Sequence, residues 1–244
     1  MDRVSKLRVK IFADGADKNG ILEMQQDPFI KGFTTNPTLM RKVGIRDYEG
    51  FARDILTCVQ KEPISFEVFS DNLDEMYEQA LQIASWGENV YVKIPVTNTQ
   101  GKSTARLIYK LAYAGVKQNI TALMTLDQVR EITTALADGP SACISVFAGR
   151  IADTGRDPLP IMINALEIMK PHTQLELIWA SPRELLNIFQ ADEIGCHIIT
   201  VTNDILKKLY LVDKDLSEFS LDTVKMFYED AVNAGFKLSP VVTA

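Results

Sequence analysis

Short runs of β-branched and aromatic residues recur along the whole chain, separated by segments richer in polar residues. Such runs are typical of strands that are buried on both faces. They predict eight strands, at Val9–Gly15, Gly32–Asn36, Pro63–Ser70, Val90–Val96, Asn119–Met124, Cys143–Gly149, Gln174–Ala180 and Cys196–Thr202. The first residues of successive strands are 22 to 31 positions apart, which is the length expected of one strand–helix unit.

Segments with a helical period lie between these strands. Apolar residues fall on one stripe in Asn72–Trp86 and again in Thr104–Ala114. Thr125 and Ser181 directly follow predicted strands, where the side chain of a helix N-cap is expected. Eight such units without a Pro/Gly-rich linker predict an α/β protein, a single (β/α)8 TIM barrel domain spanning residues 1–244.

Two segments depart from the repeat. The first connection, Ala16–Lys31, contains Gly20 and Pro28, so a weak helix is expected there. After the eighth strand, residues 217–244 form an extra amphipathic helix and a tail. This helix either closes its own barrel or packs on a neighbouring subunit, and the sequence leaves both possibilities open.

Composition and charge narrow the class of protein. The chain is 46% hydrophobic and 24% charged, which is ordinary for a soluble globular protein. Its net charge of −6 and its scattered basic residues exclude a general nucleic-acid footprint or a basic membrane-binding surface. The N-terminus lacks the apolar core of a signal peptide, and no apolar run approaches the ~18 residues of a membrane span. We therefore expect a cytoplasmic enzyme or binding protein, with neither nucleic acid nor membrane as partner.

Metal-ligand spacing is absent from the sequence. The three cysteines, Cys58, Cys143 and Cys196, are far apart and form no CxxC motif, and His172 and His197 have no metal-motif neighbours. The cysteines are expected to be small buried side chains in a reducing compartment, and no metal is expected.

Lys93 stands in the middle of the apolar strand Val90–Val96, with no carboxylate beside it in sequence. An ammonium in such a strand loses hydration, which favours the neutral amine, and a neutral lysine amine is a nucleophile toward carbonyls. Schiff-base chemistry is one interpretation. The other is a lysine at a strand end whose stem packs while its charge reaches water.

The other predicted strands also end in polar residues, and in a TIM barrel these ends build the active site. They deliver Asp14, Thr35, Asn36, Glu67, Asn119, Thr121, Arg150, Ser181 and Arg183. Singly, each has a structural explanation, such as a turn or a helix cap. Together with Lys93 they suit aldol chemistry. An imine on the lysine is an electron sink for breaking a C–C bond, and Asp14 or Glu67 moves the hydroxyl proton.

The remaining charges at this end suit a sugar phosphate. Arg150 and Arg183, with the Ser181 hydroxyl, are able to hold a phosphate group. No nucleotide-binding loop competes, since the chain has neither GxGxxG nor a complete P-loop. The residues alone thus predict a class I aldol-type enzyme that acts on a sugar phosphate.

Six stretches carry a more specific signal. They are FADG at Phe12–Gly15, TTNPTL at Thr34–Leu39, VKIPVT at Val92–Thr97, NIT at Asn119–Thr121, VFAGRI at Val146–Ile151 and ASPR at Ala180–Arg183. Together they resemble the transaldolase family and occur in family order over most of the chain. The resemblance implies a (β/α)8 barrel, in agreement with the periodicity.

The resemblance also implies roles. Lys93 would be the Schiff-base lysine and Asp14 the acid/base, while Glu67 and Thr121 would orient the water of imine formation and hydrolysis. The substrate-binding residues would be Thr35, Asn36, Asn119, Phe147, Arg150, Ser181 and Arg183, with the asparagines at a dihydroxyacetone unit and the arginines and serine at a phosphate. No metal or organic cofactor is implied. Small members of the family are often ring-shaped homo-oligomers, so a homo-oligomer is expected.

Two positions separate the branches of this family. The fructose-6-phosphate aldolase branch typically has Gln where Glu67 stands and Tyr where Phe147 stands, so both residues favour the transaldolase branch. The expected reaction moves a dihydroxyacetone unit from a ketose phosphate, such as fructose 6-phosphate, to an aldose. The alternatives are a lyase that releases free dihydroxyacetone and a barrel that binds sugar phosphates without turnover. Pro182 replaces the usual Phe, which suggests an unusual acceptor and leaves the pentose phosphate pathway and a specialised-sugar pathway both open.

Overall fold

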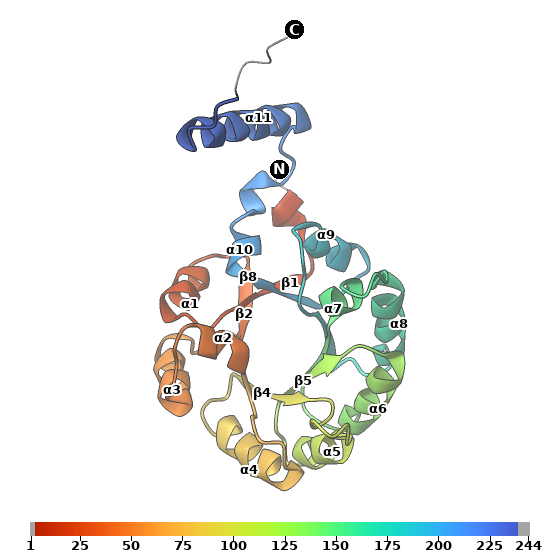
Figure 1. Ribbon diagram of the computed structural model, residues 1–244. Coiled ribbons are helices and arrows are strands. Elements are labelled where there is room, and N and C mark those ends of the chain that lie inside the picture. The colour runs from red at the N-terminus through yellow and green to blue at the C-terminus, as the bar shows by residue number, and fades with distance from the viewer. Residues whose placement is uncertain (1–2, 239–244) are drawn as a thin grey trace.

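Eight parallel strands close into a barrel in sequence order in the computed structural model, which describes residues 3–238 (Figure 1). The strands are β1 (Lys10–Asp14), β2 (Ile30–Thr34), β3 (Ile64–Glu67), β4 (Val90–Pro95), β5 (Gln118–Leu123), β6 (Ala142–Val146), β7 (Leu175–Trp179) and β8 (Ile198–Thr202). Each overlaps its predicted range, which confirms the (β/α)8 TIM barrel. β8 pairs with β1, so the sheet has no edge.

Helices surround the barrel (Figure 1). Their bounds are α1 (Lys18–Gln25), α2 (Pro37–Lys42), α3 (Tyr48–Cys58), α4 (Leu73–Ala84), α5 (Ala105–Tyr113), α6 (Leu126–Leu136), α7 (Ala148–Ala152), α8 (Leu159–Met169), α9 (Leu186–Glu193), α10 (Asn203–Leu206) and α11 (Leu216–Asn233), with the short 3-10 helices η1 (Arg3–Lys6) and η2 (Leu209–Leu211). The weak first connection does form a helix, because Asp17 caps it by accepting the N–H of Gly20.

The predicted N-caps have different outcomes. Thr125 caps α6 in a full capping box with Gln128. Ser181 is not a cap: it has a φ of 60°, in the left-handed region, and α9 begins only at Leu186. The prediction for Ser181 was wrong because Pro182 and Arg183 continue as a loop instead of starting a helix.

Side chains from alternate strand positions fill the barrel interior. A separate apolar cluster is made of Phe12, Cys143, Ile178, Ala180 and Ile198, with Tyr91 and Phe147 packed against it. The Phe12 ring needs a glycine on the neighbouring strand, since a Cβ on Gly32 would lie 2.6 Å from Cζ of Phe12. Ala180 and Phe147 of this cluster also line the cavity described below.

Helix α11 lies apart from the barrel (Figure 1), and none of its residues is buried. Its apolar side chains are open to solvent, including Phe227 at 62% exposure and Tyr228 at 71%. The helix therefore does not close its own barrel, which was one of the two possibilities. Residues 239–244 of the predicted tail lie outside the described residues. Within residues 3–238, the helices lack the combined length and apolarity needed to cross a bilayer.

Candidate active site

A cavity of about 600 Å³ opens where the strands end at their C-terminal side. Ten of the predicted site residues line it: Asp14, Asn36, Glu67, Lys93, Asn119, Thr121, Phe147, Arg150, Ser181 and Arg183. The remaining one, Thr35, is buried behind the wall, where its hydroxyl donates to the carbonyl oxygen of Ser65 (2.8 Å). The topology thus brings the predicted residues to one place.

Lys93 reaches into this cavity from β4 and is only 7% exposed. Its Nζ donates a hydrogen bond to the carbonyl oxygen of Thr35 (3.2 Å) and lies 3.5 Å from Oε2 of Glu67. The strand register places the two side chains together, because Glu67 of β3 pairs directly with Lys93 of β4. The amine is therefore enclosed by polar partners and does not extend into bulk water.

Asp14 and Glu67 are carboxyl groups with raised pKa values. Burial raises the pKa of Asp14, while the charge of Lys93 and a hydrogen bond from the Thr34 hydroxyl (2.8 Å) oppose that shift. Burial also raises the pKa of Glu67; Lys93 opposes that shift and the charge of Asp14 adds to it. A carboxyl group whose pKa is raised is better suited to exchange a proton with a substrate than an ordinary surface carboxylate.

Replacing Asp14 with asparagine should stabilise the fold by an amount that grows with pH. Because its folded-state pKa is raised, the folded chain binds this proton more tightly than the unfolded chain. Stability is therefore lost as pH rises from about 4 through the folded-state pKa. Asparagine does not titrate, so the variant escapes this loss.

The measurement is chemical denaturation of the unmutated protein and of Asp14→Asn at a series of pH values above about 4. Asp127→Asn, on the exposed face of α6, is the matched control. A stability difference that shrinks with rising pH would contradict the expected environment of Asp14.

Thr121 lies at an irregularity of β5. The register with β6 shifts between Ile120 and Leu123, and Ala122 has a φ of 66°, in the left-handed region. Such bulges turn side chains toward functional sites. The hydroxyl of Thr121 is buried and has no hydrogen-bond partner in the described part of the chain. A buried hydroxyl without a partner costs about 1–3 kcal/mol, so this group is suited to a ligand or a bound water.

The two asparagines are held by their own partners. Asn119 donates through Nδ2 to the Ser65 hydroxyl (3.0 Å) and accepts from the Ser145 hydroxyl (2.7 Å). Asn36 caps α2, because its Oδ1 accepts the N–H of Leu39 (2.9 Å). The side-chain nitrogen of each asparagine is then the group that can face a ligand, and its orientation is fixed by these bonds.

Arg150, Ser181 and Arg183 line the cavity, and both arginines are exposed to solvent. Arg183 is held by Asp153, to which it donates through Nε (3.0 Å) and again through Nη2. The hydrogen bond from Arg183 lowers the pKa of Asp153, and the charge of Arg150 adds to this effect. Asp153 thus orients Arg183 and offsets part of its charge.

Several residues of the site were not predicted. They are Ser65 and Ser145, which hold Asn119; Lys42 and Asp204, which line the cavity; and Asp153, which holds Arg183. The serines had a signal, because each stands two positions before a predicted site residue and so faces the same side of its strand. Lys42 and Asp204 lie on helices, Asp153 lies in the turn after α7, and none of the three had such a signal.

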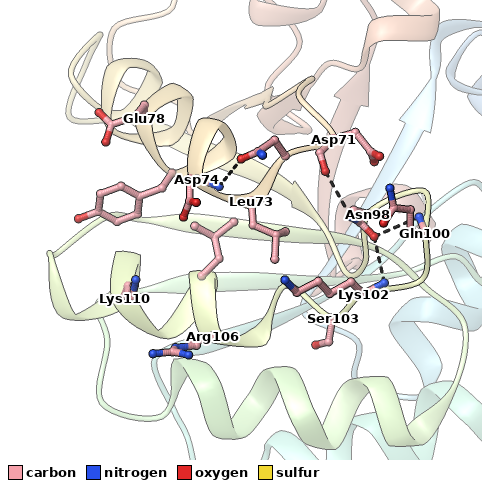
Figure 2. Close-up of a pocket in the computed structure, with 13 residues that line it drawn as sticks. Asp71, Leu73, Asp74, Glu78, Asn98, Gln100, Lys102, Ser103, Arg106 and Lys110 are labelled. Carbon is pink, nitrogen blue, oxygen red and sulfur yellow. Dashed lines mark hydrogen bonds between the residues drawn. The ribbon is translucent and has the colours of Figure 1, made fainter.

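A larger groove of about 700 Å³ lies outside the barrel between α4 and α5 (Figure 2). Asp74 and Glu78 line one side of it, and Lys102, Arg106 and Lys110 line the other. All five charged side chains are exposed. The barrel cavity is smaller, but it alone of the two contains buried ionisable groups with shifted pKa values, so it is the candidate active site.

Comparison with known proteins identifies a family. Residues 11–244 match the family model described as Transaldolase/Fructose-6-phosphate aldolase. A probable transaldolase from Dehalococcoides mccartyi is 33% identical over 218 residues, covering 88% of this chain and 97% of that protein. A probable transaldolase from Thermoanaerobacter sp. is 32% identical over 231 residues, covering 94% of this chain and all of that protein.

Two solved structures share the fold. The structure of 2,3-dimethylmalate lyase has a TM-score of 0.55 at 12% identity, covering 98% of this chain and 89% of the other. A mandelate oxidase mutant has a TM-score of 0.53 at 11% identity, covering 84% of this chain and 66% of the other. At such identities the likeness concerns the barrel alone. On its own sequence and the family match, this chain belongs to the transaldolase/fructose-6-phosphate aldolase family.

Proposed function

We propose that this protein is a class I transaldolase that forms a Schiff base through Lys93. One observation carries the proposal: the Lys93 amine is buried in a cavity, 3.5 Å from the Glu67 carboxylate, with Asp14 lining the same cavity. Family membership supports the same reaction class. The transferred group is dihydroxyacetone, taken from a ketose phosphate and given to an aldose.

The steps assign one task to each group. Lys93 gives up its ammonium proton and attacks the ketone carbon; that proton then leaves with the carbinolamine hydroxyl as water, which gives the protonated imine. Asp14 then takes the proton of the neighbouring hydroxyl as the C–C bond breaks, which releases an aldose and leaves an enamine on Lys93. The enamine attacks the aldehyde carbon of the acceptor, and Asp14 returns its proton to the new hydroxyl. Water held by Glu67 and Thr121 finally hydrolyses the imine.

Substrate binding divides between the inner wall and the mouth of the cavity. The fixed side-chain amides of Asn36 and Asn119 bind the hydroxyls of the dihydroxyacetone unit, beside the Thr35 carbonyl that accepts from Lys93. Arg150 and the Ser181 hydroxyl bind the phosphate. Arg183 contributes the N–H groups that Asp153 leaves unused.

The choice between transfer and simple cleavage depends on the fate of the enamine. The family description covers both activities, but Glu67 and Phe147 favour transfer, because Phe147 offers the imine water no hydroxyl. Product should therefore form from fructose 6-phosphate only when an aldose phosphate is added. Rapid release of dihydroxyacetone without an acceptor would assign the protein to the lyase branch.

The experiment that tests the covalent step is borohydride reduction with fructose 6-phosphate, followed by peptide mass spectrometry. We expect the mass of one reduced three-carbon unit on the peptide that contains Lys93. The control is the same treatment without sugar. An unmodified Lys93 peptide, or a barrel that binds the sugar without any adduct, would overturn the proposal.

We also propose that the single barrel domain, residues 1–244, works as a cytoplasmic homo-oligomer in which α11 packs on a second copy. The exposed Leu221, Val224 and Phe227 support this assembly, because an unpaired apolar helix face is costly in water. Sedimentation should give a multiple of the 27.3 kDa chain mass. A monomer at micromolar concentration would refute the assembly.

A further inference from the structure

The end of β3 lacks part of a neighbouring strand. β2 and β3 pair over only two positions, Phe33 with Ile64 and Thr34 with Ser65. β2 then ends, and the chain turns into α2. On its other side β3 continues to pair with β4 as far as Glu67.

The main chain of Glu67 faces this gap. In a parallel sheet the N–H and C=O groups of one residue point to the same neighbouring strand. Ile64 and Val68 donate toward β4, to the carbonyl oxygens of Asn89 and Lys93, so Glu67 points the opposite way, toward β2. Without another partner, both of its main-chain groups would be unpaired beside the cavity.

Tyr48 fills the gap with a single hydroxyl. Its O–H donates to the carbonyl oxygen of Glu67 (2.7 Å), and the same oxygen accepts the N–H of Glu67 (2.7 Å). Burial raises the pKa of Tyr48, so the hydroxyl stays protonated and keeps its donor. The ring is held by Phe69 and Trp86, at centroid distances of 5.4 and 6.1 Å.

The consequence concerns the carboxylate that Glu67 carries. That carboxylate lies 3.5 Å from the Lys93 amine. Two residues after Glu67, the chain reaches the exposed Phe69 outside the barrel. We propose that Tyr48 is a positioning residue: its hydroxyl takes the place of the missing strand, fixes the main chain of Glu67, and so sets the distance between carboxylate and amine. This inference rests on the proposed function, in which Glu67 orients the water of imine formation and hydrolysis.

Tyr48→Phe is the direct test, because it keeps the ring and its packing and removes only the hydroxyl. We expect single-turnover imine formation, trapped by borohydride with fructose 6-phosphate, to slow by roughly tenfold or more, since small misplacements of catalytic groups have large effects. KM should change less than about twofold, because Tyr48 touches no substrate-binding group. The pH profile of imine formation should also shift, as Glu67 changes its contact with Lys93. Tyr77→Phe, on the partly buried face of α4, is the matched control and should leave the rate unchanged.

A double-mutant cycle separates positioning from a general loss of structure. If Tyr48 acts through Glu67, then Tyr48→Phe should add little in the background of Glu67→Gln. Full additivity, or an unchanged rate and pH profile in Tyr48→Phe, would overturn the inference.

If Tyr48→Phe does not fold, Phe69→Leu, which loosens the Tyr48 ring, should slow imine formation to a smaller extent and leave KM unchanged. An unchanged rate in Phe69→Leu would then overturn the inference. Failure of the unmutated protein to form any adduct would instead refute the proposed function.

Discussion

Replacing Lys93 with methionine should lower kcat for transfer by a factor on the order of 10⁴ or more, because loss of the proposed covalent nucleophile removes the whole reaction path. Methionine keeps a side chain of similar length but cannot form an imine. The measurement is a coupled assay of aldose exchange, together with the borohydride trap. Lys102→Met, an exposed lysine of the groove between α4 and α5, is the matched control and should retain full activity.

The same variant should reveal the charge balance of the cavity. The charge of Lys93 lowers the pKa values of Asp14 and Glu67 against the effect of burial. In the Lys93→Met variant this charge is absent, so the pKa values of both carboxyl groups rise further. The folded chain then holds the two carboxyl protons to higher pH, and its stability falls more steeply as pH rises above about 4. Transfer above about a hundredth of the normal rate, or an adduct on another lysine, would show that Lys93 is not the nucleophile.

The scaffold of this site could be predicted because its signals are local. Strand periodicity and the regular spacing of strand starts are written along the chain, and the parallel barrel then forces all the strand ends to one side. Lys93 was conspicuous for the same reason, as a charge within an apolar run. The pairing of Glu67 with Lys93 follows from neighbouring strands in register.

The supporting contacts could not be predicted, because they join residues far apart in sequence. Tyr48 reaches Glu67 from the start of α3, and Asp153 holds Arg183 across 30 positions. Nothing in the local sequence around Tyr48 distinguishes it from an ordinary helix residue that packs on the core. The left-handed conformation of Ser181 is also hidden, since serine seldom adopts it and a neighbouring element must impose it.

That element is α7, which approaches the Ser181 loop through Gly149. A Cβ built on Gly149 would lie 1.5 Å from the carbonyl oxygen of Ser181 and 3.2 Å from Nε of Arg183. The N–H of Gly149 also donates to the carbonyl oxygen of Ala180 (3.4 Å). This close backbone contact sets the position of the Ser181 loop relative to α7, which carries Arg150. The proposed phosphate site therefore depends on the absence of a side chain at residue 149.

Gly149→Ala should consequently weaken phosphate binding more than any substitution of an exposed residue around the cavity. The atom in the way belongs to the backbone, so no rotamer change relieves the overlap and the Ser181 loop must move. Overpacking of this kind costs about 1–3 kcal/mol of stability. A loop displaced by about 1 Å should raise KM for phosphorylated sugars by roughly 10- to 100-fold.

Adduct formation at Lys93 with a substrate that lacks a phosphate shows whether only phosphate binding is impaired. Dihydroxyacetone carries no phosphate, so its borohydride adduct should still form in Gly149→Ala, while transfer from fructose 6-phosphate fails at ordinary concentrations. Gly15→Ala is the matched control, because a Cβ there meets no atom within 4 Å. If Gly149→Ala binds fructose 6-phosphate as tightly as the unmutated protein, the phosphate is held elsewhere in the cavity, and the cation to test next is Lys42, which lines the same cavity from α2.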